Sequence, residues 1–307
     1  MRVVIYSKVL KDADVPFVQK LFDVLHEKNI AAYVHEPYLK ELQGNINFQS
    51  NVGNFLGYSD FKSREFDYVI TLGGDGTILS AINFVRDSNV PILGINLGRL
   101  GFLASIEKTR IDEAVHLLIN GRFSVEQRGL LYLESNKPLF DGLNFALNDF
   151  TLLKRDTSSM ISIHTFINGA YLNTYWADGI ILSTPTGSTG YSLSCGGPIV
   201  FPNSGNFVLT PVAPHNLNIR PVVISDDSIV SFEVEGRAEN FLATLDSRHE
   251  VITSDYQLAI RKADFSVNLV QLQGRGFMKT IRKRQLQAQI SVPIYAGTRI
   301  GEAHLRN

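Results

Sequence analysis

The residues with the clearest chemical potential in this sequence form one short turn, Gly73-Gly74-Asp75-Gly76-Thr77. The turn lies between a stretch typical of a strand and a stretch typical of a helix. Glycines let backbone N–H groups approach a ligand closely, and a helix N-terminus favours phosphate. Thr77 is placed to cap the helix or to bond a phosphate oxygen. Because a carboxylate repels phosphate, Asp75 fits as a metal ligand, as a proton acceptor or, without any ligand, as the helix N-cap.

A second polar segment spans residues 178–198, with the sequence DGIILSTPTGSTGYSLSCGGP. Its hydroxyls can bind ribose, amide and phosphate groups without a formal charge, and Tyr191 can stack on a base. Upstream, Asn148-Asp149 supplies an amide and a carboxylate that together can clamp a sugar diol. Without a ligand, the long segment is a hydrophilic connection between strands, and Asn148-Asp149 is an Asx turn.

Two familiar nucleotide-binding motifs are excluded by spacing. The chain contains no Gly-Lys pair, which a Walker-type phosphate loop requires. Leu79 stands where a dinucleotide fingerprint needs Gly or Ala, and Asn96 stands where it needs an acidic residue. The sequence therefore gives little support to a standard dinucleotide-binding dehydrogenase.

The elements that must position these residues change character along the chain. In the first half, strand and helix patterns alternate, which predicts a parallel sheet with helices on its faces. The predicted strands are residues 3–6, 31–34, 67–72 and 91–95, and the predicted helices are 16–28 and 77–85. Residues 40–65 are rich in Asn, Gly and Ser, and they predict a long loop that is a candidate lid.

The second half favours antiparallel strands. After a predicted helix at 111–119, alternation by two dominates at residues 161–167, 230–234, 256–260 and 265–269. The fold class predicted is an α/β N-terminal domain with a parallel sheet and a β-rich, sandwich-like C-terminal domain. We place the α/β domain at residues 1–100 and the β-rich domain at 101–279, with residues 280–307 rejoining the first domain.

Composition narrows the function classes. The 307 residues carry a net charge of −1 and are 44% hydrophobic, so no global field attracts DNA or an anionic membrane. Cys195 is the only cysteine, which excludes an intrachain disulfide and a cysteine-cluster zinc site. No apolar run approaches the roughly 18 residues of a membrane span. We expect a cytoplasmic protein with neither a nucleic-acid nor a membrane partner.

The motifs taken together resemble the NAD kinase family. The resemblance rests on GGDGT at 73–77, NLGRLGFL at 96–103, Asn148-Asp149 and the segment 178–198, in this order. PHNLNIRPVV at 214–223, Leu245-Asp246 and GFMKTIRKR at 276–284 extend it. GGDGT alone is shared with diacylglycerol-type lipid kinases, whereas the long Ser/Thr/Tyr segment is far more specific.

The resemblance implies a reaction and its cofactors. Members of the family phosphorylate the adenosine ribose 2′-hydroxyl of NAD to give NADP, with ATP or polyphosphate as donor and a divalent metal, expected to be Mg²⁺. NAD binds between the two domains, and members are homodimers or homotetramers. The resemblance assigns no metal ligand.

The resemblance also implies a role for individual residues. Asp75 is the general base. The residues expected to bind the nucleotides are Gly74, Gly76, Thr77, Asn148, Asp149, Asp178, Thr186, Thr189, Gly190, Tyr191, Ser194 and His215. The chain departs from the family pattern at Asp149, where Glu is commoner, at Gly190, where Ala is usual, and at Ser247-Arg248, where Gly-Gln is common.

Two alternative functions stay open at this point. A lipid or other small-molecule kinase shares the GGDGT turn but has no role for residues 178–198. A non-catalytic NAD(P)-binding regulator is the other alternative, although the candidate base is intact. Thermal stabilisation by NAD separates the lipid kinase from the rest, and turnover separates the enzyme from the regulator.

Overall fold

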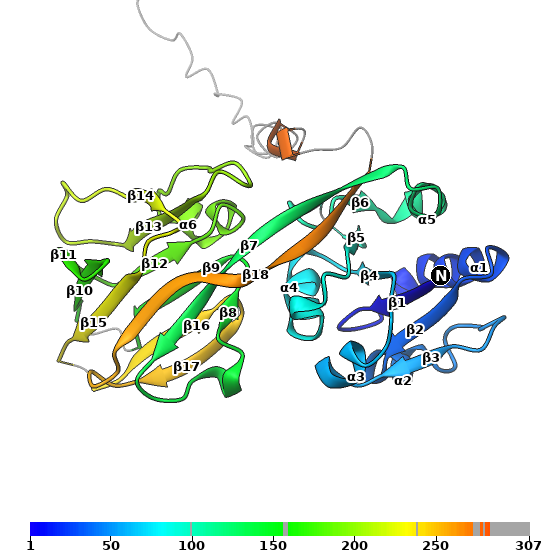
Figure 1. Cartoon of the computed structure of the whole chain (residues 1–307), viewed down its shortest axis with the longest axis horizontal. Coiled ribbons are helices and arrows are strands. Elements are labelled where there is room, and N and C mark those ends of the chain that lie inside the picture. Colours follow the sequence, from blue (N-terminus) through cyan, green and yellow to red (C-terminus); the bar gives the residue numbers. More distant parts are fainter. Residues whose placement is uncertain (99, 156–158, 238, 273–276, 279, 283–307) are drawn as a thin grey trace, which may run out of the picture.

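In the computed structural model, two sheets and the helices around the first of them build the molecule (Figure 1). The structure describes residues 1–98, 100–155, 159–237, 239–272, 277–278 and 280–282. One sheet has twelve strands and runs through both halves of the chain, and the other has six. The predicted segment 280–307 falls almost entirely outside the described residues.

Five parallel strands form the N-terminal part of the larger sheet, in the order β3-β2-β1-β4-β5. They are β1 (Arg2–Tyr6), β2 (Ala31–His35), β3 (Gly53–Phe55), β4 (Tyr68–Leu72) and β5 (Ile92–Asn96). Val3 and Ile5 of β1 pack into one apolar core, and Val4 and Tyr6 pack into another. Burial on both faces explains why these strands are continuous apolar runs.

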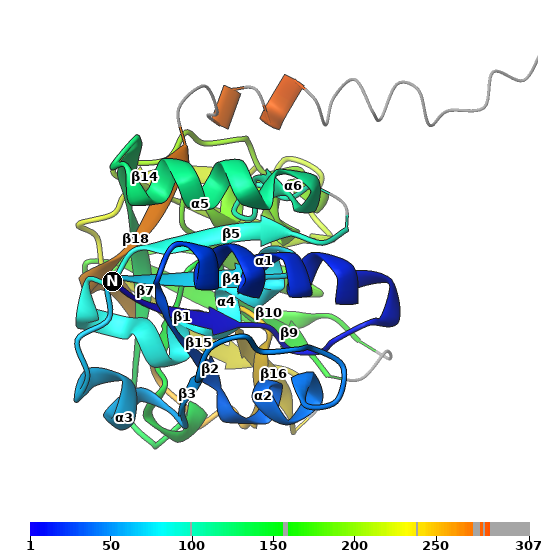
Figure 2. The same ribbon diagram turned by 90° about the vertical axis from the view of Figure 1, so that its right-hand side faces the viewer.

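Helices cover both faces of this parallel sheet (Figure 2). α1 (Val15–Glu27), α2 (Glu36–Leu42) and α5 (Ile111–Ile119) contribute to the first core, and α3 (Tyr58–Lys62) and α4 (Asp75–Val85) contribute to the second. The predicted α/β arrangement is therefore confirmed.

The prediction of one long loop at residues 40–65 is correct only for residues 43–52. The rest of the segment holds the end of α2, the edge strand β3 and α3. Leu42, Phe55 and Phe61 are all at most 1% exposed. These elements are three to seven residues long, too short for a periodic pattern, and their buried apolar side chains fix them in the core rather than in a lid.

The C-terminal half is a β-sandwich, as predicted. The six-stranded sheet is entirely antiparallel, in the order β14-β13-β12-β9-β16-β17. It faces strands β10 and β15 of the larger sheet, and the rings of Phe150 and Phe232 stack across the interface at 5.8 Å. The strands are β9 (Asp149–Lys154), β10 (Ile161–Ile167), β11 (Ala170–Ala177), β12 (Gly179–Ser183), β13 (Asn206–Val212), β14 (Val222–Ser225), β15 (Val230–Glu235), β16 (Phe241–Leu245) and β17 (Arg248–Ile252).

Two long strands join the halves. β7 (Phe123–Ser135) and β18 (Leu258–Leu272) pair as an antiparallel ribbon that crosses from one half to the other (Figure 1). Near its end, β18 pairs in parallel with β5, with Leu269 opposite Ile92. The remaining short elements are β6 (Ile106–Glu107), β8 (Phe145–Ala146) and α6 (Tyr191–Ser194). The domain bounds stay a prediction.

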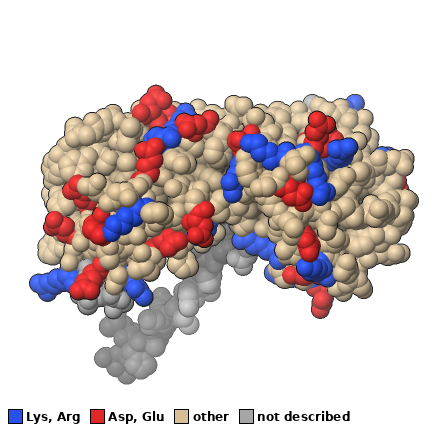
Figure 3. Space-filling model, turned by 60° about the horizontal axis from the view of Figure 1, so that its bottom comes forward, with Lys and Arg blue, Asp and Glu red and all other residues tan. Residues whose placement is uncertain are grey.

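Charged side chains are dispersed over the surface. On the face in Figure 3, basic and acidic residues alternate without a broad area of one sign. Among the described residues, no helix is both long and apolar enough to cross a membrane.

Candidate functional site

The GGDGT turn lies where the strand order of the parallel sheet reverses. β4 ends at Leu72 and α4 begins at Asp75, on the side of β1 opposite to β2. In open α/β sheets, ligands bind beyond the carboxyl ends of the strands at this switch point. The sheet topology therefore presents Asp75 at the expected place for a ligand.

Three backbone N–H groups hold the carboxylate of Asp75. Phe102 N donates to Oδ2 at 2.8 Å, and Leu103 N and Ala104 N donate to Oδ1 at 3.1 and 2.9 Å. A Cβ on Gly101 would lie 1.8 Å from Oδ1, so only glycine fits beside the carboxylate. An ionised carboxylate has about four acceptor positions. One of them therefore remains for a further donor.

The N-cap of α4 is not one of the residues predicted for it. Gly74 is the N-cap of α4, and neither Asp75 nor Thr77 caps it. Thr77 is buried instead, and its Oγ1 lies 2.1 Å from where a Cβ on Gly73 would be. The φ of Gly73, +154°, also disfavours a side chain. Gly74 and Gly76 are exposed, and a Cβ on either would meet nothing within 4 Å, so the space beside Asp75 is open.

A second buried carboxylate shapes the Asn148-Asp149 segment. Asp246, in the turn between β16 and β17, accepts hydrogen bonds from the N–H groups of Leu147, Asn148 and Asp149 at 2.9, 2.7 and 3.3 Å. Its φ of +53° is a conformation that aspartate tolerates better than most residues. Nearby, Arg248 donates to the carbonyl oxygens of Leu143 and Phe145, so it has a structural role rather than an exposed position.

The Ser/Thr-rich segment packs directly on Asn148. Thr184 N donates to the carbonyl oxygen of Asn148 at 2.9 Å, and Thr184 Oγ1 donates to that of Leu147 at 2.6 Å. A Cβ on Gly187 would lie 2.0 Å from Asn148 O, so glycine is required for this approach. The structure thus joins two motifs that are more than thirty residues apart in the sequence.

Asp149 is a strongly perturbed acid of this region. It is 7% exposed, and burial together with the Asp246 carboxylate raises its pKa from 3.8 to about 7. Gly190 lies beside it, with a Cβ position 3.9 Å from Oδ2. A group that titrates near neutrality at a ligand site can exchange a proton when the ligand binds.

The stability of the chain should depend on pH through Asp149. Its pKa is higher in the folded than in the unfolded chain, so the folded chain binds more protons between about pH 4 and about pH 7. The free energy of unfolding should therefore fall as pH rises through this window, by at most about 1.4 kcal/mol per pH unit. Asp149→Asn should flatten the dependence. Urea unfolding at pH 5 and pH 7 measures it, and equal slopes for both proteins would contradict the assignment.

Tyr191 and Asp178 lie near Asp149. Burial raises the pKa of Tyr191, and the neighbouring Cys195, with which its hydroxyl pairs, and then the charges of Asp178 and Asp149 raise it further. The carboxylate of Asp178 forms an ion pair with Lys154 at 2.7 Å. Lys154 is half-buried in this pair. Thr189, Gly190 and Ser194 belong to the same turn and helix as Tyr191.

His215 lies elsewhere. Its ring packs on that of Trp176 at 4.4 Å, and its N–H donates to Trp176 O. Trp176 belongs to β11, the edge strand farthest along the larger sheet from the parallel strands (Figure 1). The structure therefore places His215 beside Trp176 of β11, which lies two residues along the chain from Asp178, and the role of His215 at the nucleotide site stays a prediction.

One apolar cluster connects the two groups of predicted residues. Leu147, next to Asn148, packs in the same core as Ile78 of α4 and as Leu103 and Ala104, which hold Asp75. The predicted base and the predicted ribose clamp are thus attached to a common support. Asp246 and Gly101 were not predicted as functional residues, and their only signal in the sequence is their place in the motifs.

A divalent cation has no protein cage in the part of the chain that the structure describes. No three His, Cys, Asp or Glu side chains come together there. Mg²⁺ is usually held by substrate phosphates, waters and one or two carboxylates. The described residues are thus compatible with a cation that substrate phosphates help to hold.

The chain matches two family models over most of its length. Residues 3–123 match the ATP-NAD kinase N-terminal domain, and residues 147–272 match the ATP-NAD kinase C-terminal domain. It is 45% identical over 281 residues to an NAD kinase of Cytophaga hutchinsonii, covering 91% of this chain and 96% of that protein. The chain belongs to the NAD kinase family. Its activity is that of an NAD kinase, the phosphorylation of NAD to NADP.

Other NAD kinases and their structures agree with this membership. An NAD kinase of Flavobacterium psychrophilum is 41% identical over 288 residues, covering 93% of this chain and 98% of that protein. A yeast NADH kinase complexed with NADH has the same fold, with a TM-score of 0.83 and 22% identity over 98% of this chain and 89% of that one. An NAD kinase from Archaeoglobus fulgidus in complex with ATP gives a TM-score of 0.72 and 24% identity over 93% and 99%. The lipid-kinase and regulator alternatives are thereby set aside.

Proposed function

We propose that the chain transfers the γ-phosphoryl group of ATP to the 2′-hydroxyl of the adenosine ribose of NAD, with Asp75 as the general base. The hydroxyl oxygen forms a bond to the γ-phosphorus, the bond from that phosphorus to the β–γ bridging oxygen breaks, and ADP leaves. The hydroxyl proton goes to Asp75. The single observation that carries this proposal is the fixed carboxylate at the switch point, with one acceptor position left and open space beside it.

Fixed geometry is the main contribution of the chain to this step. Three N–H bonds hold Asp75 without using flexible side chains, so little reorganisation is needed when the hydroxyl arrives. A placed base contributes typically 10²–10⁴-fold to such a reaction. The N–H groups at the start of α4 face the same open space and suit the phosphates of the donor.

NAD is proposed to bind between Asp75 and the Asn148 segment. Asn148 and Asp149 bind ribose hydroxyls, and Asp178 and Tyr191 contact the bases. Gly74 and Gly76 line the phosphoryl-transfer side, and Thr189, Gly190 and Ser194 line the NAD side. Thr77 and Thr186 are buried, so a direct contact of either with a nucleotide stays a prediction. Support comes from the burial of Asp149 and the packing of residues 184–187 on Asn148.

ATP as donor is supported by the ATP complex of the Archaeoglobus fulgidus enzyme. The cation, expected to be Mg²⁺, arrives on the phosphates of the donor and neutralises charge there. No residue of this chain is assigned as its ligand. Polyphosphate is the alternative donor.

The test is a coupled assay of the full chain with NAD, ATP and Mg²⁺, in which an NADP-specific dehydrogenase detects the product. NADP formation with ATP supports the proposal. If NADP forms with polyphosphate but not with ATP, the donor is polyphosphate. A folded chain that makes no NADP with either donor contradicts the proposal.

The chain is further proposed to act as a homodimer or homotetramer. Trp176, Tyr171 and Leu217 are 52%, 60% and 85% exposed, and large apolar side chains of this kind favour an interface. The exposed His215, which packs on Trp176, would then lie close to this interface. Light scattering coupled to size exclusion should give a mass of two or four chains. Trp176→Glu should shift it toward the monomer, whereas Val251→Glu, at an exposed position of β17 in the other sheet, should not.

A further inference from the structure

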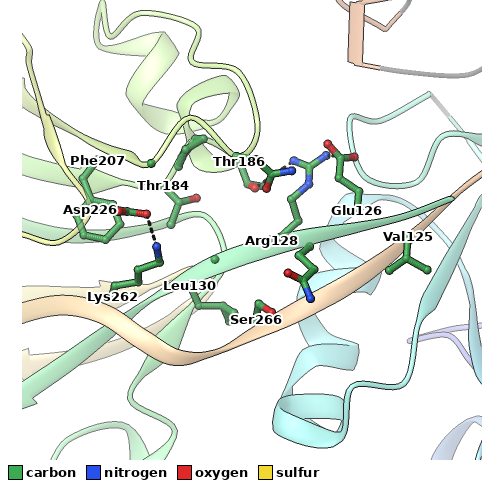
Figure 4. A pocket seen from close by; sticks show the side chains of 15 residues that line it. Val125, Glu126, Arg128, Leu130, Thr184, Thr186, Phe207, Asp226, Lys262 and Ser266 are labelled. Carbon is green, nitrogen blue, oxygen red and sulfur yellow. Dashed lines mark hydrogen bonds and ion pairs between the residues drawn. The ribbon is translucent and has the colours of Figure 1, made fainter.

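A cavity of about 650 Å³ is lined in part by Thr184, Pro185 and Thr186. Its walls are the β7–β18 ribbon, the 184–186 segment and the loops around β13 and β14 (Figure 4). Asp75, Asn148 and Asp149 are not among the residues that line it. The volume is within the range of small-molecule sites.

A buried guanidinium forms the floor of this cavity. Arg128 is 4% exposed; its Nη1 donates to Thr186 Oγ1 at 3.2 Å, and its Nη2 donates to Glu126 Oε2 at 2.8 Å. Figure 4 shows Arg128 rising from β7 between these two partners. Its Nε is buried and, among the described residues, has no hydrogen-bond partner. A buried donor without an acceptor is destabilising by about 1–3 kcal/mol.

The unpartnered Nε indicates what the cavity lacks. Nε and Nη2 form the two-pronged edge with which arginine binds an oxyanion. Glu126 occupies only one prong. Its side chain is 24% exposed and can turn outward. An anion with two oxygens would fill both prongs and relieve the unpaired donor.

A second cation lines the same cavity. Lys262 of β18 pairs with Asp226 at 2.7 Å, and its side chain is 48% exposed. Each cation is neutralised by a neighbouring carboxylate, so the two ion pairs together carry no net charge. A ligand phosphate can replace these carboxylates as the partner of Arg128 and Lys262.

We propose that this cavity binds a phosphate-bearing small molecule through Arg128 and Lys262. The phosphate belongs either to the tail of the phosphoryl donor or to a separate effector. The first of these alternatives rests on the proposed function. In both cases Thr186 links the ligand to the segment that packs on Asn148, so occupancy changes NADP formation.

The test uses inorganic tripolyphosphate as the probe and titration calorimetry of the full chain without NAD. Arg128→Lys, which keeps the charge but removes the fork, and Lys262→Gln should each weaken binding about tenfold or more. Lys137→Gln is the matched control, because Lys137 is a similarly exposed lysine paired with Asp255 outside the cavity. Undiminished binding by folded Lys262→Gln and Arg128→Lys, or none by the wild type, overturns the proposal.

Kinetics separate the two sources of the phosphate. If it is the donor's, Arg128→Lys raises the KM for ATP. If the phosphate belongs to an effector, Arg128→Lys leaves the KM for ATP unchanged. Tripolyphosphate added at saturating ATP then changes the rate of NADP formation by the wild type but not by the variants. If the wild type forms no NADP but the variants still lose tripolyphosphate binding, the inference about the cavity stands. The proposed function is then contradicted.

Discussion

Asp75→Asn should lower kcat for NADP formation by roughly 10²–10⁴-fold while leaving the Kd for NAD nearly unchanged. An amide keeps the size of the side chain but cannot take the hydroxyl proton. The amide should also weaken the turn, because its NH₂ group would stand in place of Oδ2. Two donors, this NH₂ group and the N–H of Phe102, would then face one another. The coupled assay gives kcat, and calorimetry gives the affinity for NAD.

The stability of this variant needs its own measurement. The opposed donors should reduce the free energy of unfolding by about 1–3 kcal/mol, which urea unfolding detects. If the folded variant retained near-normal kcat, Asp75 would not be the base, and Asp149 would become the leading candidate.

Gly101→Ala should have an effect of similar size without changing any reacting group. The new methyl would lie 1.8 Å from Asp75 Oδ1 and 2.4 Å from Cγ, so the carboxylate must leave its three N–H donors. We expect kcat to fall by about two orders of magnitude or more, because a displaced base loses its alignment with the hydroxyl. The Kd for NAD should change little.

A matched control lies in the same loop. A Cβ on Gly98 would have Asn96 Oδ1 as its nearest neighbour, at 4.0 Å, so Gly98→Ala should retain kcat. The double variant Asp75→Asn/Gly101→Ala should lose no more activity than Asp75→Asn alone, since both changes remove the same carboxylate. Fully additive losses would show that Gly101 acts through something other than Asp75.

The parts of the site that sequence could predict are those with side-chain chemistry in a regular pattern. The GGDGT turn was placed correctly between β4 and α4, because glycine after an apolar strand is a strong local signal. The three donors to Asp75 could not be predicted, since backbone N–H groups have no residue signature. Gly101 is their only trace in the sequence.

The remaining differences between the predictions and the structure arise from tertiary packing. Residues 36–62 form short elements whose identity depends on where Leu42, Phe55 and Phe61 are buried. Residues 123–135 carry no strand prediction, and only the fold shows that Arg128 is buried there. Asp246 was noted as part of a motif, but its hold on residues 147–149 depends on a turn almost a hundred residues later.

The position of β18 has a consequence for how the chain is made. This last strand lies between β15 and β5, so the N-terminal sheet is bordered on one side by nearly the final described residues. On the ribosome, β5 therefore emerges long before β18, and until then only β6, paired with Ile95 and Asn96, covers this edge. A fragment that ends at residue 123 would leave the Ile92 end of the edge uncovered permanently, which makes the two halves poor candidates for separate expression.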